Sequence, residues 1–501
     1  MGILDSYWGR HAEALQCEGA AFLLGRRPYR SGANVSILLA LCAILAIITL
    51  AAVRCSSQRT AAAPTITHAI TIRSDPYTPH LPKRAYDYHR ASRVLLFVGI
   101  GWHILCLALF LRLGLSARTR DFADFVFLRL RRGSVEDQPS GEPPVHDRAT
   151  RSSDRLDHMG SLSRKPAGLG AHLEGRQSDL RRPGFISVTI FYLFYSVCSK
   201  IWSLPIGLAG YAIERRFGFS NESLLLFLKD HLIGLCTSWV MIPVIWIGYV
   251  IYARWPKRWW LVLWAVMAPT TLFVTVVYPL VVAPLYNRFS PMEPGSLRSD
   301  ILALAERAGI HGGNVLVEDT SRRTSHVNAY VTGIGPSTRI VLNDTALQTL
   351  PRDQILAMMG HEMGHYAEHH VLVSAAAGII GTGLILGVLA ILLPRLANRF
   401  GRAFRLRGLS DLAVLPLLLL TVYLLGLLGE PVSTALSRTL EKRADVYGLR
   451  MTGLNDATAK LMVGFAERDL SDPNPPWLLH LWFGTHPTLS DRIEFARRFR
   501  R

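Results

Sequence analysis

The apolar residues of this 501-residue chain are gathered in long runs and do not recur at the spacing of one helix face or of a half-buried strand. A helix rises about 1.5 Å per residue, so about 20 residues cross the roughly 30 Å of hydrocarbon in a bilayer. Seven runs are long enough to be predicted membrane spans: residues 36–53, 94–115, 186–211, 232–253, 259–285, 371–393 and 412–428. The pattern therefore predicts a mainly α-helical integral membrane protein.

The segment between the fifth and sixth spans, residues 286–370, has a different pattern and predicts a small α+β domain. Its expected elements are a helix at 297–309, a strand at 315–318, a hairpin of 328–332 with 339–343, and a helix at 354–366. Beyond the seventh span, residues 433–453 predict a separate helix, and the tail from residue 455 predicts two or more short helices.

The segment between the second and third spans is polar. Residues 134–183 are rich in Ser, Gly, Pro, Asp and Arg, which predicts a disordered linker, and residues 121–132 before it predict a short interfacial helix. The resulting organisation has six parts: an N-terminal segment with two spans (1–133), the linker (134–183), spans three to five (184–285), the α+β domain (286–370), spans six and seven (371–430), and a C-terminal part of the same domain (431–501).

The net charge of +18 narrows the classes of partner. The basic residues lie in loops between spans without interleaved aromatic residues, so we attribute them to lipid headgroups and membrane topology and expect no nucleic acid. Both sets of loops are basic, which leaves the orientation in the membrane open. The six cysteines form no CxxC pair, so neither a disulfide framework nor a cysteine metal site is indicated.

The sequence HEMGH at residues 361–365 stands directly ahead of the sixth span. His361 and His365 are four residues apart, share one helix face, and can fill two positions of a tetrahedral Zn²⁺. Glu362 follows the first histidine and can act as a general base toward water. This combination is typical of a zinc peptidase.

A catalytic zinc needs a third protein ligand. Residue 371 is valine, which excludes the arrangement HExxHxxGxxH, and His369 would lie about 6 Å farther along the helix axis than His365, too far to share one metal. The better candidate is Glu441, because spans six and seven return its helix to the membrane side of the HEMGH motif. Asp445, one turn later, is placed to accept a hydrogen bond from a ligand histidine.

These motifs together resemble the type I CAAX prenyl protease family, in a bacterial member, from about residue 186 to the C-terminus. Seven segments carry the resemblance: ERRFGFSNES at 214–223, PLYNRFSPME at 284–293, SRRTSHVNAYVTG at 321–333, RIVLNDT at 339–345, HEMGH at 361–365, SRTLEKRAD at 437–445, and a late HP at 486–487 followed by DRI at 491–493.

The resemblance implies seven membrane helices that enclose a chamber, with an inward-facing zinc site and cleavage at or near the C-terminus of isoprenylated CAAX proteins. It assigns one Zn²⁺ per chain to His361, His365 and Glu441, the gluzincin arrangement, with Glu362 as the residue that activates water. Carried over position by position, Asn328 and Ala329 would pair with the extended substrate. His486 and Arg492 would lie near the site and stabilise the oxyanion, with a structural pairing to Asp445 or another acidic group as an equal alternative.

Two alternatives stay open. General CAAX prenylation is not a bacterial feature, so a bacterial member could be a quality-control protease for membrane proteins without prenyl specificity. A non-catalytic, zinc-stabilised scaffold or transporter is a different class of protein, and Glu362 argues against it because a structural site needs no base. The expected location is the bacterial inner membrane, or the endoplasmic reticulum in a eukaryote. The sequence predicts a peptide or protein substrate, leaves its prenylation open, and says nothing of oligomeric state.

Overall fold

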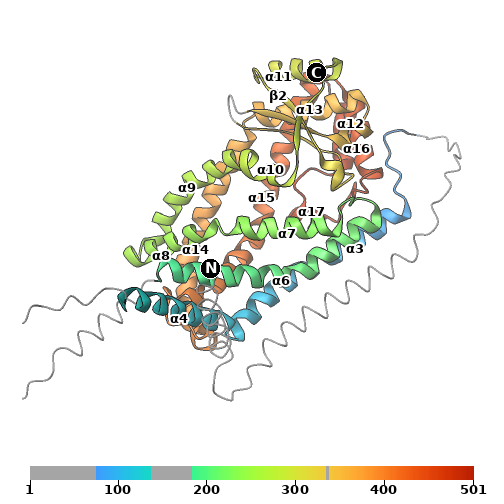
Figure 1. Cartoon of the computed structure of the whole chain (residues 1–501). Coiled ribbons are helices and arrows are strands. Elements are labelled where there is room, and N and C mark those ends of the chain that lie inside the picture. Colours follow the sequence, from blue (N-terminus) through green and yellow to red (C-terminus); the bar gives the residue numbers. More distant parts are fainter. Residues whose placement is uncertain (1–74, 137–182, 334–337, 501) are drawn as a thin grey trace, which may run out of the picture.

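The computed structural model describes residues 75–136, 183–333 and 338–500. The first predicted span, 36–53, and nearly all of the predicted linker 134–183 lie outside these residues. Figure 1 shows two parts, a set of long helices and, at one end of them, the sheet with the shorter helices packed around it. The C-terminus lies in this second part.

Five helical segments among the described residues are long and apolar enough to cross a membrane, and a bent pair would make a sixth. They are α3 (Lys83–Arg112), α6 (Phe185–Phe217), α7 (Leu224–Ser238) with α8 (Met241–Arg254), α14 (His370–Phe404) and α15 (Leu415–Thr452) with the turn before it. The bent pair, at 45°, joins α9 (Trp259–Val277) to the π-helical turn Tyr278–Val282 and α10 (Ala283–Tyr286). These segments coincide with the second to seventh predicted spans, and the count of seven and the chamber stay predictions.

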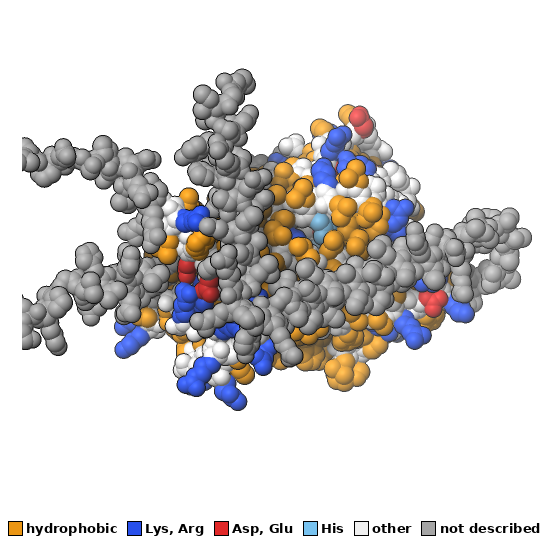
Figure 2. All heavy atoms as spheres, turned by 60° about the horizontal axis from the view of Figure 1, so that its bottom comes forward, with side chains coloured by type: hydrophobic (Ala, Val, Ile, Leu, Met, Phe, Trp, Pro, Cys, Tyr) orange, Lys and Arg blue, Asp and Glu red, His pale blue; other side chains and the backbone are white. Residues whose placement is uncertain are grey.

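The surface of the long helices suits a lipid environment. Large apolar side chains such as Leu225, Val240 and Leu384 are exposed by 79%, 71% and 68%. On the face shown in Figure 2, hydrophobic side chains are abundant among the described residues. Exposed apolar side chains along long helices are expected where helices meet hydrocarbon. Helix α4 (Leu115–Glu136) contains the predicted interfacial helix and packs against α6.

The predicted α+β domain is built on a four-stranded mixed sheet in the order β1-β2-β4-β3. Its strands are β1 (Phe289–Pro291), β2 (Asn314–Glu318), β3 (Ala329–Thr332) and β4 (Arg339–Asn343), with helices α11 (Ser296–Arg307), α12 (Asp344–Thr349) and α13 (Arg352–Ala367). The β3–β4 hairpin is confirmed, and β2 pairs with β4 in parallel. The short elements β1 and α12 were not predicted, because three and six residues are too few to show a period.

The tail forms three helices, α16 (Asn455–Glu467), α17 (Trp477–Phe483) and α18 (Leu489–Arg498), which agrees with the predicted two or more. Met359 and Met363 of α13 share one apolar core with Leu449 of α15, Met462 of α16 and Ile493 of α18. Residues from 286–370 and 431–501 therefore share one apolar core, although α14 and the first part of α15 separate them in the sequence.

One prediction was wrong: the seventh span and the helix at 433–453 are not separate, because α15 runs unbroken from Leu415 to Thr452 with Pro431 inside it. Proline has no N–H, so it leaves the carbonyl of Leu427, four residues earlier, without its helical partner. The indole Nε1 of Trp482 donates to that carbonyl at 2.8 Å. A contact from α17 thus replaces the hydrogen bond that proline removes, and the helix continues.

Candidate active site

Helix α13 carries His361, Glu362 and His365, and α15 packs along it with Glu441. The ligand atoms of the two histidines and Glu441 all lie within 4.8 Å of one another. The two histidine Nε2 atoms are 3.1 Å apart, and Glu441 places one oxygen 3.3 Å from His361 Nε2 and the other 3.5 Å from His365 Nε2. The three residues predicted as metal ligands therefore lie together in one cluster.

The dimensions of this cluster fit a small metal ion. Nitrogen and oxygen ligands at about 2.0–2.2 Å from a tetrahedral zinc lie about 3.3–3.6 Å from one another, close to the separations observed here. Glu441 Oε2 is buried and makes no hydrogen bond. A buried carboxylate oxygen without a donor is costly unless a cation satisfies it. Imidazole and carboxylate are also the donor types that zinc takes in catalytic sites.

Three glycines let the two helices approach closely enough to form this cluster. A Cβ added at Gly448 of α15 would lie 2.8 Å from the backbone nitrogen of His361, and one added at Gly364 of α13 would lie 3.1 Å from the Cα of Ala444. At Gly360 the nearest atom, a methyl carbon of Thr452, would be 2.5 Å away. The absence of side chains at these positions therefore sets the distance of Glu441 from the histidines.

Asp445 and Arg492 support the cluster from behind. His361 Nδ1 lies 2.8 Å from Asp445 Oδ1, which leaves Nε2 to face the other ligands. Arg492 donates to both oxygens of Asp445, from Nε at 2.9 Å and from Nη2 at 2.7 Å. Arg492 is buried and its guanidinium is committed to this ion pair, so it takes up the structural pairing that the sequence left as an alternative.

His486 comes from the loop between α17 and α18, and its Nε2 lies 3.3 Å from Glu441 Oε2. Its side chain is half exposed, and Nδ1 contacts the hydroxyl of Thr485 at 2.9 Å. His486 therefore contacts the cluster directly and is also accessible to solvent, whereas Arg492 is buried.

His370 contacts the site and was not predicted to do so. Its Nδ1 lies 2.9 Å from Nδ1 of His365, and the residue is buried. His369 was expected to continue the face of the HEMGH helix, but α13 ends at Ala367 and His369 has the left-handed backbone conformation, with φ of 54°. The turn directs His370, not His369, toward the metal-site helix. In the sequence, the adjacent histidines at 369–370 were the pattern that could have indicated this contact with the site.

The protonation of the cluster reflects its burial and its carboxylates. Burial, with repulsion from His361, lowers the pKa of His365 to about 4, so this imidazole is neutral as a ligand must be. Burial also disfavours a charged His361, but the hydrogen bond to Asp445 and the nearby carboxylate of Glu441 outweigh it and raise the pKa of His361 to about 9. The carboxylates therefore favour a cation at this point. Burial raises the pKa of Glu362 to about 7, near that of an effective general base.

Strand β3 lies at the edge of the sheet beside α13. The N–H of Asn343 donates to the carbonyl of Asn328 at 3.0 Å, so residue 328 faces β4. In an antiparallel pair the next residue faces the other way, which turns the backbone of Ala329 and Val331 toward the outer edge. No described strand pairs with that edge. The Ala329 N–H contacts the Asn328 side-chain oxygen at 3.0 Å.

The loop that enters β3 is fixed by His326. Its Nδ1 lies 3.5 Å from Asp469 and its Nε2 lies 3.6 Å from Glu214 of α6, and its ring stacks on Phe219. The hydrogen bonds to Asp469 and Glu214 raise the pKa of His326 to about 9. A protonated His326 therefore ties the edge strand both to the end of α6 and to the loop after α16.

The long apolar helices define an integral membrane protein, and the candidate metal cluster with Glu362 beside its first histidine is that of a metalloprotease. The class is therefore a multi-pass membrane metalloprotease. The chain is 35% identical over 318 residues to an uncharacterised metalloprotease, YhfN, of Bacillus subtilis, a match that covers 63% of this chain and 74% of that protein. It belongs to peptidase family M48, whose model matches residues 291–500. Residues 172–288 match a second model, described as CAAX prenyl protease N-terminal, five membrane helices.

Eukaryotic relatives agree with this assignment. CAAX prenyl protease 1 of Saccharomyces cerevisiae is 27% identical over 317 residues, which cover 60% of this chain and 69% of that protein. Among solved structures, the crystal structure of S. mikatae Ste24p has the same fold, with a TM-score of 0.60 at 20% identity, and the match covers 93% of this chain and 98% of that one. The family resemblance predicted from the sequence motifs is confirmed.

Proposed function

We propose that this metalloprotease is a zinc endopeptidase of the gluzincin type, in which His361, His365 and Glu441 hold one Zn²⁺ and Glu362 is the general base. The observation that carries the proposal is the convergence of three ligand groups from two helices beside a glutamate one residue after the first ligand. When bound, the zinc supplies a Lewis acid that polarises the scissile carbonyl and lowers the pKa of water.

The residues of the chain then have distinct tasks. Glu362 takes the proton of the attacking water and delivers it to the leaving amine. Asp445 holds the Nδ1 side of His361 and so fixes its tautomer, while Arg492 holds Asp445 in turn. His486, half exposed beside Glu441, is placed to donate a hydrogen bond to the carbonyl oxygen as negative charge develops on it.

The outer edge of β3 is the proposed site for the substrate backbone. An extended peptide adds to an exposed sheet edge through main-chain hydrogen bonds, and Ala329 and Val331 present their backbone groups there. Asn328 holds the start of this strand against β4. Because β3 packs beside α13, a peptide on this edge would lie next to Glu362.

The proposed substrates are proteins that end in an isoprenylated CAAX sequence, as the names of the relatives suggest. The membrane helices support this choice, since a lipid-modified C-terminus reaches the protease through the bilayer. We further propose seven spans around a chamber, and the bacterial inner membrane as location, because the relative at 35% identity is bacterial.

The test compares a farnesylated CAAX peptide with the same peptide unprenylated, using the purified full chain. The variant Glu362→Gln should hold metal and cleave neither peptide. The matched control Glu368→Gln, which alters a carboxylate at the end of the same helix outside the ligand cluster, should cleave normally. Faster cleavage of the farnesylated peptide would support prenyl recognition. Equal cleavage would indicate a protease without prenyl specificity, and a metal-loaded wild type that cleaves neither would contradict the proposal.

A further inference from the structure

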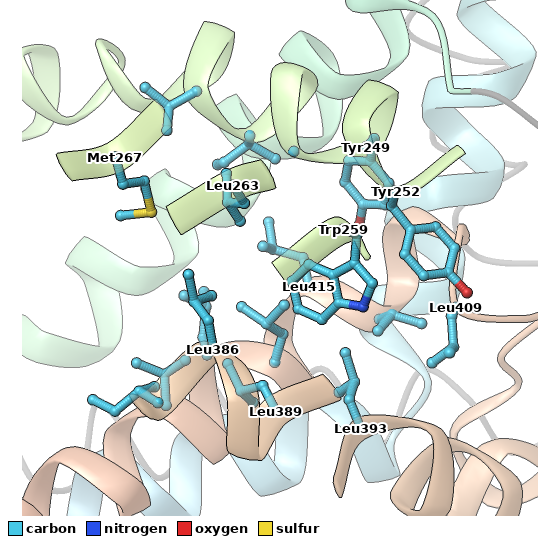
Figure 3. A pocket seen from close by; sticks show the side chains of 18 of the residues that line it. Tyr249, Tyr252, Trp259, Leu263, Met267, Leu386, Leu389, Leu393, Leu409 and Leu415 are labelled. Carbon is cyan, nitrogen blue, oxygen red and sulfur yellow. The ribbon is translucent and has the colours of Figure 1, made fainter. Parts of the chain in front are cut away.

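The membrane part contains an apolar cavity of about 580 Å³ bounded by α6, α8, α9, α14 and α15. Tyr249 and Tyr252 of α8, Trp259 and Leu263 of α9, and Leu389 of α14 are among its lining residues (Figure 3). We infer that this cavity binds one acyl chain of an anionic phospholipid whose headgroup lies on the basic loop between α8 and α9.

The cavity is separate from the metal cluster. Along α15, its lining extends from Leu415 to Val422, and Val422 precedes Glu441 by 19 residues, which is about 28 Å of helix. Along α14, the first lining residue, Thr382, follows His370 by 12 residues, or about 18 Å, and Pro394 lies about 36 Å away. The cavity therefore occupies the end of the membrane part that is remote from the peptidase site.

The lining selects a hydrocarbon ligand. The volume lies within the range of about 300–1,000 Å³ that is usual for ligand sites. Nearly all lining side chains are aliphatic or aromatic, and a tyrosine hydroxyl among them, that of Tyr249, already donates to the carbonyl of Asp411 at 3.2 Å. Water needs two to four polar partners and would find few here. A flexible acyl chain from the surrounding bilayer supplies the missing van der Waals contacts.

The residues around the Tyr252 and Trp259 end of the cavity favour an anionic lipid headgroup. These two lining residues bracket the end of α8 and the loop of residues 255–258, where Arg254, Lys257 and Arg258 are exposed. No carboxylate of the described residues forms an ion pair with any of the three. Unpaired cations beside tryptophan and tyrosine at a helix end are suited to a lipid phosphate at the membrane interface. The acyl chain would then enter between α8 and α9.

Gly248 provides a direct test, because it lines the cavity and a Cβ added there meets nothing within 4 Å. Gly248→Leu should fill the cavity without disturbing the backbone. The control is Gly378→Leu on α14, a position that is equally open but outside the cavity. A third variant, with Arg254, Lys257 and Arg258 each changed to Gln, removes the charge on the loop and leaves the cavity intact.

The measurements are co-purifying phospholipid, by mass spectrometry, and the rise in Tm on adding phosphatidylglycerol or phosphatidylcholine to the full chain in detergent. Wild type and Gly378→Leu should retain lipid and be stabilised more by phosphatidylglycerol, whereas Gly248→Leu should lose the retained lipid and the Tm response. The triple variant should keep a lipid but lose the preference for phosphatidylglycerol by up to about 100-fold.

Equal lipid retention by Gly248→Leu and Gly378→Leu would overturn the proposed cavity site. An equal wild-type response to both lipids, or displacement of the phospholipid by free farnesol, would overturn the anionic phospholipid as its ligand. None of these measurements involves cleavage, so the result does not depend on the proposed peptidase mechanism.

Discussion

Replacing Gly448 with alanine should separate α13 and α15, the two helices that carry the proposed metal ligands. The new Cβ would lie 2.8 Å from the His361 nitrogen, 3.0 Å from the carbonyl carbon of Gly360 and 3.1 Å from the Cα of His361, and all three atoms are backbone. Ordinary contacts of this kind begin at 3.4 Å, so restoring one requires α13 and α15 to move apart by about 0.6 Å. No flexible side chain is available to absorb the shift.

A metal site tolerates much less displacement, since ligand distances vary by only about 0.2 Å. The loss of a residue that merely supports a ligand lowers metal affinity by about 10–100-fold, so withdrawal of Glu441 itself should cost at least about 100-fold. The overpacked contact should also lower the stability of the folded protein by about 1–3 kcal/mol. Competition with a chelator measures the metal Kd, and thermal unfolding of the metal-free protein measures the second effect.

Gly429→Ala is the matched control, because Gly429 also lies on α15 and an added Cβ there meets nothing within 4 Å. This variant should bind metal like the wild type. If Gly448→Ala also bound metal as tightly as the wild type, the argument that close helix contact sets the ligand geometry would be refuted.

Three further predictions follow from the same contacts. Asp445→Asn should lower metal affinity by about 10–100-fold in a chelator competition, and an unchanged Kd would show that Asp445 does not orient a ligand. The contact with Asp469 is the main cause of the raised pKa of His326. The protonated His326 therefore contributes its full stabilisation below a pH of about 6.5 and loses it as the pH rises through about 9. Tm should fall over this window in the wild type and should fall less in His326→Gln. Trp482→Phe leaves the carbonyl of Leu427 without its donor, so stability should fall by about 1–3 kcal/mol, and an unchanged Tm would contradict the account of the proline-containing helix.

The features that the sequence predicted well are those carried by local pattern or fixed spacing. The spans from residue 94 onward follow from hydrophobic runs, and the β3–β4 hairpin follows from a turn rich in glycine and proline. The HEMGH helix and Glu441 meet because an even number of crossings separates their two segments. The roles of Glu362 and His486 stay proposals, because geometry alone does not assign a chemical task.

The features that were missed depend on contacts distant in the sequence or on an unusual backbone conformation. The break expected near Pro431 does not occur because Trp482, far along the chain, satisfies the exposed carbonyl. His370 reaches His365 because His369, a residue without the freedom of glycine, takes a positive φ. Neither feature produces a periodic pattern of apolar residues, so the spacing of apolar residues could not have predicted either of them.

The division of the peptidase unit by a membrane hairpin has a consequence for biogenesis. The histidines are synthesised before α14, and Glu441 emerges only with the end of α15, after the chain has crossed to the far end of the membrane part and returned. A chain in which this hairpin fails to insert would carry both histidines without the proposed third ligand. With that ligand set, proteolytic competence would be acquired only by molecules that have completed membrane integration.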